Sequence, residues 1–362
     1  MAVIGGGFYG AFVANEIKTL DPDLDVTLVE KENALFARAS STNQGQFHMG
    51  YMYSADPALA MECAENVERF LHSFGPAVDR EVSTLYGIHQ DSEVSPAEYV
   101  RFCDDMRLPL HIVDPPRGVF GDAVIATFRS AETTFNSATV QQILAERLAR
   151  TGVKVVTGFD VHHVDQFSNG LRLTGRDRSL RAGQVFNVTF ADINGLHQRS
   201  GLPAIPLRYD TFLHFVVDLP APYRHTAATV IRGPYASLLP STFRRGHVLA
   251  SGRHRRVRSA TTAAPAEAMS GREVRAVYER AISEALPYLP LLGRARLRGH
   301  TLGTRAAQLD PRTGAYTSKA SVFSNLGDLA NYHVVLGGKV SCLFDVAHTI
   351  EAIIRRPVAA PA

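Results

Sequence analysis

Two patterns of apolar and polar positions occur along this chain, and the first occupies its beginning. A short apolar run, residues 1–4, leads through the spaced glycines Gly5, Gly7 and Gly10 into a segment whose apolar residues have helical spacing. A further apolar run, Asp25–Glu30, has the length and composition of a strand. This order predicts the strand, tight turn, helix and second strand of a dinucleotide-binding βαβ unit.

Each glycine has a separate role in such a unit. Gly5 allows the sharp turn out of the strand, Gly7 lets a pyrophosphate approach the backbone, and Gly10 lets the helix pack close to the strand. The helix N-terminus offers unpaired N–H groups and the positive end of its dipole to the phosphates. Glu30 ends the second strand about 20 residues beyond Gly10, where an acid accepts hydrogen bonds from an adenosine ribose. The pattern leaves open whether the nucleotide is FAD or NAD.

The second pattern is a period of two in the apolar residues, which begins near Pro206 and continues to Arg258. Turn residues separate the runs, so we expect an antiparallel sheet that forms a substrate domain. Between the two patterns, Pro96–Met106 and the segment capped by Ser137 have helical spacing, and Gly152–Gly158 has the composition of a strand. This alternation predicts an α/β protein in which a parallel sheet carries the nucleotide.

Composition narrows the classes of protein that fit. The 362 residues exceed a usual single core and suggest two structural parts, and the formal net charge of +3 calls for neither a nucleic-acid nor a membrane partner. No apolar run reaches the ~18 residues of a membrane span, and the first strand leaves no room for a signal peptide, so we expect a soluble, cytoplasmic protein. Cys63, Cys103 and Cys342 lack metal-ligand spacing, so we expect reduced thiols and no metal.

A polar yet aromatic segment, Ser40–Tyr53, follows the second strand. It is too polar and glycine-rich for a core helix and too aromatic for a solvated loop, so we expect it to line a site. The segment resembles the flavin-contacting stretch of the D-amino-acid oxidase superfamily of FAD-dependent oxidoreductases, in particular its L-2-hydroxyglutarate and glycerol-3-phosphate dehydrogenase branches. The resemblance implies FAD as the cofactor, flavin contacts from residues 43–45, and His48 beside the substrate.

His48 is the candidate base. An imidazole near its unperturbed pKa of ~6.5 is a natural acceptor for a hydroxyl proton at neutral pH. The alternative for any single histidine is a structural role with its ring nitrogens in hydrogen bonds. The motif around His48 favours the site.

Two later segments extend the same resemblance. Gly299–Ala306 resembles the Gly-x-Arg segment of the family, which implies that Arg305 pairs with a substrate carboxylate through its planar guanidinium. Tyr332–Ser341 resembles the Gly-Gly-Lys of the two dehydrogenase branches, which implies that Lys339 and nearby backbone N–H groups reach the flavin or the substrate. This second glycine turn is what favours FAD over NAD.

Polar groups on the period-two strands are further candidates for contact with the substrate. The ones we place there are His214, Tyr235, Ser237 and His254, together with Tyr51 from the polar segment. For the basic run Arg253–Arg258 we favour a solvated turn over a role in anion recognition.

One position departs from the family pattern. The strand that follows the small β-meander usually ends in Asn-Ala-x-Gly, with the glycine close to the cofactor. Here the order is Asn187-Val188-Thr189-Phe190. Either the backbone takes another path at Phe190 or the adenine side of the site is reshaped.

The resemblance implies a D-amino-acid-oxidase-like α/β fold: a Rossmann-like FAD-binding domain of residues 1–80, 130–205 and 300–362, and a substrate domain of residues 81–129 and 206–299. The expected catalytic residues are His48, Arg305 and Lys339. The expected cofactor contacts are Gly5, Gly7, Phe8, Tyr9, Gly10, Glu30, Lys31, Ser41, Asn43, Gln44, Gly45, Gly337, Gly338, Lys339 and Val340. The expected substrate contacts are His48, Tyr51, Tyr235, His254 and Arg305.

The function expected from these residues is oxidation of a small, anionic substrate, in which a hydride passes from a CH–OH carbon to flavin N5 while His48 takes the proton. Two alternatives remain open at this point. One is a flavin amine oxidase that acts on an amino acid or on an amino group of a natural-product intermediate. The other is a protein that binds a nucleotide without turnover. The substrate, the electron acceptor and the oligomeric state are not predicted.

Overall fold

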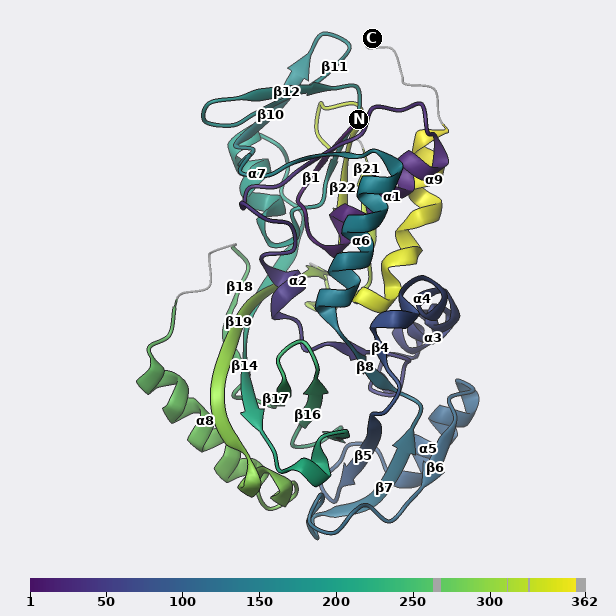
Figure 1. Ribbon diagram of the computed structural model, residues 1–362, viewed down its shortest axis with the longest axis vertical. Coiled ribbons are helices and arrows are strands. Elements are labelled where there is room, and N and C mark those ends of the chain that lie inside the picture. The colour runs from purple at the N-terminus through teal and green to yellow at the C-terminus, as the bar shows by residue number, and fades with distance from the viewer. Residues whose placement is uncertain (263–267, 311, 325, 356–362) are drawn as a thin grey trace.

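The computed structural model describes residues 1–262, 268–310, 312–324 and 326–355. A mostly parallel sheet with its helices forms the upper part of the view in Figure 1. A larger sheet, which contains the long strands β14 (Leu207–Asp218) and β19 (Arg296–Leu309), forms the lower part. The α/β class, with a Rossmann-like domain and a second sheet domain, is thereby confirmed.

The upper sheet is arranged around the first strand of the chain. In spatial order its strands are β21 (Ser321–Ser324), β22 (Tyr332–Leu336), β13 (Val185–Asn187), β1 (Ala2–Ile4), β2 (Thr27–Val29) and β9 (Lys154–Val156). Neighbouring strands are parallel, except for the antiparallel pair β21 and β22. All of β1 is buried, as expected for a parallel strand that is covered on both faces.

The two faces of this sheet contact different layers, because successive residues of a strand point to opposite sides. Val3 belongs to the core that includes the helices of one face, while Ala2 and Ile4 belong to the core of the other face. The helices of the first face are α1 (Phe8–Leu20), α6 (Ser137–Thr151) and α9 (Ala347–Ile354). The second face carries α7 (Ile193–Ser200) and the meander β10 (His163–Phe167), β11 (Gly170–Thr174) and β12 (Ser179–Ala182).

The larger sheet forms the predicted second domain. Its order is β20 (Tyr316–Thr317), β19, β14, β17 (Gly246–Ser251), β16 (Ala236–Ser241), β15 (Thr226–Ile231), β5 (Ser83–His89), β7 (Val124–Ser130) and β6 (Leu110–Ile112), with β18 (Arg256–Ala260) also paired to β14. The helix α8 (Gly271–Ala285) and the 3₁₀ segment η4 (Pro290–Arg294) pack on its core. The helix α5 (Pro96–Asp105) packs near β5 and β7.

A small third sheet joins the two domains. It consists of β3 (Gln46–Phe47), β8 (Thr133–Phe135) and β4 (Val78–Asp79). The short helices α2 (Ala39–Thr42), α3 (Pro57–Glu65) and α4 (Val67–Phe74) and the 3₁₀ segment η1 (Gly75–Ala77) lie in the same stretch of chain. Because β3 pairs with β8, the polar segment that contains His48 lies next to residues 133–135.

Three details differ from the sequence predictions. The side chain that caps α6 is that of Asn136, whose Oδ1 accepts from Ala138 N at 2.9 Å, so Ser137 is the first helical residue and not the cap. The larger sheet is mixed, because β15 runs parallel to β5 and the connection between them passes through the upper domain. The predicted domain boundary between residues 299 and 300 falls inside β19.

Cys63, Cys103 and Cys342 are buried free thiols, and the Sγ atoms of Cys63 and Cys342 are 3.9 Å apart. Among the helices of the described residues, none is both long and apolar enough to span a bilayer.

We expect Gly10→Ala to destabilise the upper domain. A Cβ at Gly10 would lie 1.7 Å from the carbonyl oxygen of Gly5, so the helix α1 would have to move away from β1. We expect a loss of about 3 kcal/mol, the upper part of the range for overpacked positions, measured as a lower midpoint of thermal unfolding. Gly271→Ala is the control, because no atom of the residues that the structure describes lies within 4 Å of a Cβ there. Equal midpoints for the two variants would contradict the prediction.

Candidate functional site

A cavity of about 1170 Å³ is lined by residues of both domains. This volume exceeds the ~300–1,000 Å³ of an ordinary small-molecule site, so there is room for a dinucleotide and a substrate together. One end of the cavity lies at the glycine turn after β1 and at the carboxyl end of β2. The other end lies beneath β14 and β19 and is lined by His48, Arg305 and Lys339.

The glycine turn has the geometry of a phosphate cradle. Gly5 has a φ of 105°, and a Cβ there would lie 2.7 Å from the carbonyl oxygen of Val188. Gly7 stands at the N-cap of α1 and lines the cavity, and it has no side chain that would cover the start of the helix. Ser40 Oγ accepts from Phe8 N at 3.0 Å. The turn is therefore suited to an anionic group at the helix N-terminus.

Glu30 lies next to this turn. Its Oε2 accepts from Gly6 N at 2.6 Å and its Oε1 accepts from Glu32 N at 2.9 Å. Both bonds fix the carboxylate at the cavity wall, near the carboxyl end of β2. An acid in this place is suited to accept from ribose hydroxyls.

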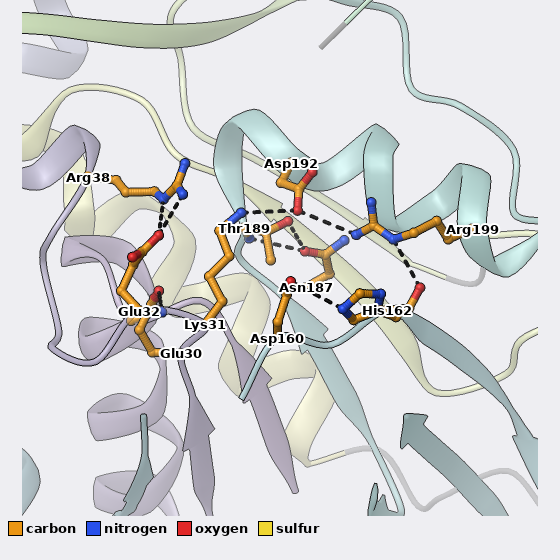
Figure 2. A network of polar contacts seen from close by, with 11 residues as sticks. Glu30, Lys31, Glu32, Arg38, Asp160, His162, Asn187, Thr189, Asp192 and Arg199 are labelled. Carbon is orange, nitrogen blue, oxygen red and sulfur yellow. Dashed lines mark hydrogen bonds and ion pairs between the residues drawn. The ribbon is translucent and has the colours of Figure 1, made fainter. Parts of the chain in front are cut away.

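Figure 2 shows a chain of ion pairs among Lys31, Asp192 and Arg199, which line the same end of the cavity. Lys31 Nζ lies 3.4 Å from Asp192 Oδ2, and Arg199 Nη2 lies 3.5 Å from the same oxygen. Arg199 Nε also donates to the backbone oxygen of His162 at 3.1 Å. Lys31 follows β2 and Asp192 ends the 3₁₀ segment η2 (Phe190–Asp192), so the pairs connect the two walls of the cavity.

Phe190 keeps the backbone conformation that favours glycine. Its φ is 55°, which costs an L-residue roughly 1–2 kcal/mol compared with glycine. The ring lines the cavity and packs against the core on the second face of the upper sheet. Two outcomes were expected at this position, another backbone path or a reshaped adenine side. The structure favours the second, because the backbone makes a left-handed turn and an aromatic side chain is added to the cavity wall.

The polar segment 40–53 is held by its own hydrogen bonds. Asn43 Oδ1 accepts from Gly45 N at 2.8 Å, and Asn43 Nδ2 donates to Ser40 O at 2.5 Å. Gln44 Nε2 lies 3.4 Å from Ser237 Oγ on β16. These contacts place Asn43, Gln44 and Gly45 on the cavity wall.

The second glycine turn lies opposite, before the 3₁₀ segment η5 (Val340–Val346). Tyr9 OH donates to Lys339 O at 2.8 Å, across 330 residues of sequence. A Cβ at Gly338 would lie 2.6 Å from Ala320 N, and one at Gly337 would lie 2.8 Å from the ring of Tyr9. The glycines are thus required by close packing, and this packing brings Lys339 to the cavity.

His48 lies in the cavity wall beside a buried carboxylate. Its Nδ1 is 3.8 Å from Glu132 Oε1, and no residue of the described chain forms a hydrogen bond with that nitrogen. Burial, with the nearby charges of Lys339 and Arg255, holds the pKa of His48 well below 6.5. The imidazole is therefore neutral at pH 7.

Glu132 accepts from three donors. They are Gln46 Nε2 at 2.8 Å, Met49 N at 2.8 Å and the hydroxyl of Tyr86. Burial raises the pKa of Glu132, and the hydrogen bonds partly oppose that rise. The hydrogen bonds fix this carboxylate beside the ring of His48.

Lys339 and Arg305 give the inner end of the cavity a positive charge. Burial, with Arg305 nearby, lowers the pKa of Lys339 to about 8. Its Nζ lies 5.4 Å from the centre of the Tyr53 ring, and we find no ion-pair partner for it in the part of the chain that the structure describes. Arg305 Nη2 lies 3.3 Å from Asp210 Oδ2, while its Nε is buried without a hydrogen-bond partner among the described atoms.

The cavity wall does not include four predicted residues: Tyr51, His254, Ser41 and Ser237. Tyr51 is fully buried in a separate core and its hydroxyl donates to Pro109 O at 2.6 Å, so it is structural. His254 points to α8, where its Nε2 lies 3.0 Å from Glu284 Oε1. Ser41 Oγ donates to Phe36 O at 2.5 Å, and its neighbour Ser40 lines the cavity instead.

Of the remaining candidates on the larger sheet, Tyr235 and His214 line the cavity, whereas Ser237 is buried behind Gln44. Burial lowers the pKa of His214 to about 4, so this ring is also neutral at pH 7.

Sequence reasoning missed several residues at the inner end. Glu132 lies between two strands, where no local pattern indicates that its side chain is buried. Arg255 lines the cavity although the basic run that contains it was interpreted as solvated. The other residues missed here are Tyr53, Phe212 and Tyr316. The sequence feature that could have indicated Arg255 as a site residue is its position at a turn between two strands.

We expect Glu132→Ala to lower the stability by about 3 kcal/mol, because Gln46, Tyr86 and Met49 N would lose a buried acceptor. Glu132→Gln keeps one acceptor oxygen and should cost less. Glu279→Ala, on the exposed side of α8, serves as the control and should change the unfolding midpoint little. A stability of Glu132→Ala equal to that of the control would overturn this view of the network.

Comparison with known proteins agrees with the architecture. Over 172 residues the chain is 25% identical to L-2-hydroxyglutarate dehydrogenase of Indibacter alkaliphilus, a match that covers 47% of this chain and only 33% of that protein. Over 369 residues it is 23% identical to the FAD-dependent monooxygenase FPY4 of Fusarium mangiferae, with 98% and 90% of the two chains covered.

Solved structures show the same fold. Glycine oxidase from Geobacillus kaustophilus is similar with a TM-score of 0.73 at 16% identity, covering 99% of this chain and 95% of that one. NikD, an unusual amino acid oxidase essential for nikkomycin biosynthesis, is similar with a TM-score of 0.75 at 14% identity, covering 98% and 93%.

The residues present fit an FAD. The glycine turn and the helix N-terminus offer donors for a pyrophosphate, Glu30 offers acceptors for a ribose, and the cavity continues to a second glycine turn. The family model described as FAD dependent oxidoreductase matches residues 1–338. The chain therefore belongs to the DAO family of FAD-dependent oxidoreductases, and its cofactor is FAD.

Proposed function

We propose that this protein oxidises the CH–OH carbon of a small anionic substrate. The observation that carries the proposal is the inner end of the cavity, where a neutral imidazole, His48, lies near the cation Lys339, which in turn lies near Arg305. A base that is already unprotonated and a positive site for an anion are the two groups that such an oxidation requires from the protein.

The cofactor would be held from both ends of the cavity. Gly5, Gly7 and the N-terminus of α1 would bind the pyrophosphate, and Glu30 would bind the ribose. Residues 43–45 and 337–340 would hold the flavin ring. Bound FAD supplies an acceptor for the hydride that leaves the substrate carbon.

His48 would take the hydroxyl proton of the substrate. Because its pKa lies well below 6.5, the base form is present at neutral pH. The positive charges of Lys339 and Arg255 disfavour protonation of His48. The carboxylate of Glu132, 3.8 Å from His48 Nδ1, favours it and so stabilises the imidazolium that forms when His48 takes the proton. Glu132 thus acts on the substrate through His48.

Arg305 and Lys339 would bind the anionic group of the substrate. The buried, unpartnered Nε of Arg305 is a donor without an acceptor in the described structure, and Lys339 has three donors to offer. The Indibacter relative is an L-2-hydroxyglutarate dehydrogenase, and this likeness supports an anionic substrate with a hydroxyl group.

A flavin amine oxidase is the second candidate, for an amino acid or an amino group of a natural-product intermediate. The structural likeness to glycine oxidase and to NikD favours it. His48 would then take a proton from an amino group in place of a hydroxyl group, and the anion site would be used in the same way.

The first experiment is an absorbance spectrum of the purified holoprotein, followed by anaerobic addition of 2-hydroxy acids and of amino acids. We expect flavin bands that bleach with a 2-hydroxy acid and persist with amino acids. Bleaching by amino acids alone, with release of ammonia, would replace the proposed function by the second candidate. Flavin bands that no substrate of either class bleaches would reject both.

The pH dependence of kcat/KM should be flat near neutrality and fall on both sides. On the acid side, activity is lost only when His48 gains a proton, which occurs well below pH 6.5. On the alkaline side, Lys339 loses its charge as the pH rises through about 8, so the substrate anion binds more weakly and KM rises.

Lys339→Met should remove this alkaline limb and raise KM at pH 7. The matched control is Lys319→Met, because Lys319 lies 3.7 Å from Glu62 and is not part of the cavity wall. An alkaline limb that persists in Lys339→Met would assign it to another group.

A further inference from the structure

We propose that Arg255 forms a second anion subsite in the cavity, so that the substrate carries an anionic group at each of its two ends, as a short dicarboxylate does. The inference rests on the proposed function, since it concerns the substrate of the same site. It begins from the place of Arg255 in the larger sheet.

Arg255 lies at the turn between β17 and β18, and this turn is anchored by backbone hydrogen bonds. Arg255 N donates to Ser251 O at 2.8 Å, Leu213 N donates to Arg255 O at 2.6 Å, and Gly252 N donates to Tyr235 O at 2.6 Å. The residue is therefore fixed to two neighbouring strands, and the direction of its side chain is set by the sheet.

The guanidinium of Arg255 stacks on two aromatic rings of the cavity wall. Its Cζ lies 4.6 Å from the centre of the Tyr235 ring and 5.1 Å from that of Phe212. Such stacking leaves the edge of the guanidinium, which carries its N–H donors, available to a carboxylate.

The neighbours of Arg255 in the basic run behave differently. Arg253 is exposed and its Nε lies 3.2 Å from Glu284 Oε2, and Arg256 is exposed. Arg255 lines the cavity, and within the described ranges no acidic side chain lies within ion-pair distance of it. Arg255 thus lies at the site, whereas Arg253 and Arg256 do not.

Arg305 stacks on Phe212 as well, with its Cζ 4.9 Å from the ring centre. Since the Cζ atoms of Arg255 and Arg305 lie 5.1 and 4.9 Å from the centre of the same ring, these two atoms are at most 10.0 Å apart. One short molecule can therefore reach both guanidinium groups.

The acids near these cations are already engaged. Asp210 pairs with Arg208 at 2.9 Å and accepts from Ser259 Oγ at 2.7 Å, in addition to its longer contact with Arg305. Glu132 is held by its own three donors. A single substrate carboxylate at Arg305 would leave Arg255 without a counter-charge in a partly buried site, which is unfavourable. A second carboxylate on the substrate removes that cost.

The test measures binding of anions that cannot be oxidised, by the change they cause in the flavin absorbance of the holoenzyme. The probes are butyrate, with one carboxylate, and succinate, glutarate and adipate, with two carboxylates at increasing separation. We expect one dicarboxylate to bind about tenfold or more tightly than butyrate.

Arg255→Gln should weaken the binding of that dicarboxylate by about 30-fold and the binding of butyrate by less than about twofold. Arg256→Gln is the matched control and should resemble the unchanged protein. Arg255→Lys, which keeps a charge, should retain part of the preference for two carboxylates. Its measurement also covers the case in which Arg255→Gln fails to retain FAD.

Equal binding of mono- and dicarboxylates by the unchanged protein would overturn the proposal. The proposal would also be overturned if Arg255→Gln weakened the binding of butyrate and of dicarboxylates by the same factor. Arg255 would then bind the first carboxylate, or would act only through the overall positive charge of the site. The probes lack an oxidisable hydroxyl group, so this result does not depend on the oxidation. A dicarboxylate preference without bleaching by any 2-hydroxy acid would reject the proposed function and leave the subsite in place.

Discussion

The close approach of α1 to β1 is the constraint on which the rest of the structure depends. Gly10 has no room for a side chain against Gly5, and Gly5 has none against Val188, so the helix, the first strand and the end of β13 meet within van der Waals distance. Because of this contact, the N-terminus of α1 faces the cavity. The position of Glu30 beside Gly6 follows from the same packing.

The inner end of the cavity shows how burial assigns chemical roles. Burial alone pushes His48 toward the neutral form and Lys339 toward a lower pKa, and the cations there disfavour further positive charge. The result is a base and a charged group within one small volume, each near the protonation state that it needs at neutral pH. Glu132 is a buried carboxylate beside the base, and its three donors keep it in place.

The sequence predicted the elements that leave a local mark. Glycines at the two turns, the acid after β2 and the period-two strands are visible in the order of residues, and the structure places them as expected. What it could not show is where a side chain points when its backbone lies at a turn or between strands. Ser40 lines the cavity and Ser41 does not, and Arg255 does while His254 does not, although each pair is adjacent. The long strand β19 was missed because Gly299 and Gly303 interrupt its apolar alternation.

The bond between the Tyr9 hydroxyl and Lys339 O has a consequence for the time at which the site forms. Its partners are separated by 330 residues, so the first and the second glycine turn come together only late in synthesis. At roughly 5–20 residues per second, a ribosome needs roughly 15 to 65 seconds to connect them. During that interval β1 lacks the strand β22 two places away in its sheet, and the glycine turn has no opposite wall. Capture of the cofactor should therefore be a late event in biosynthesis, after most of the chain has left the ribosome.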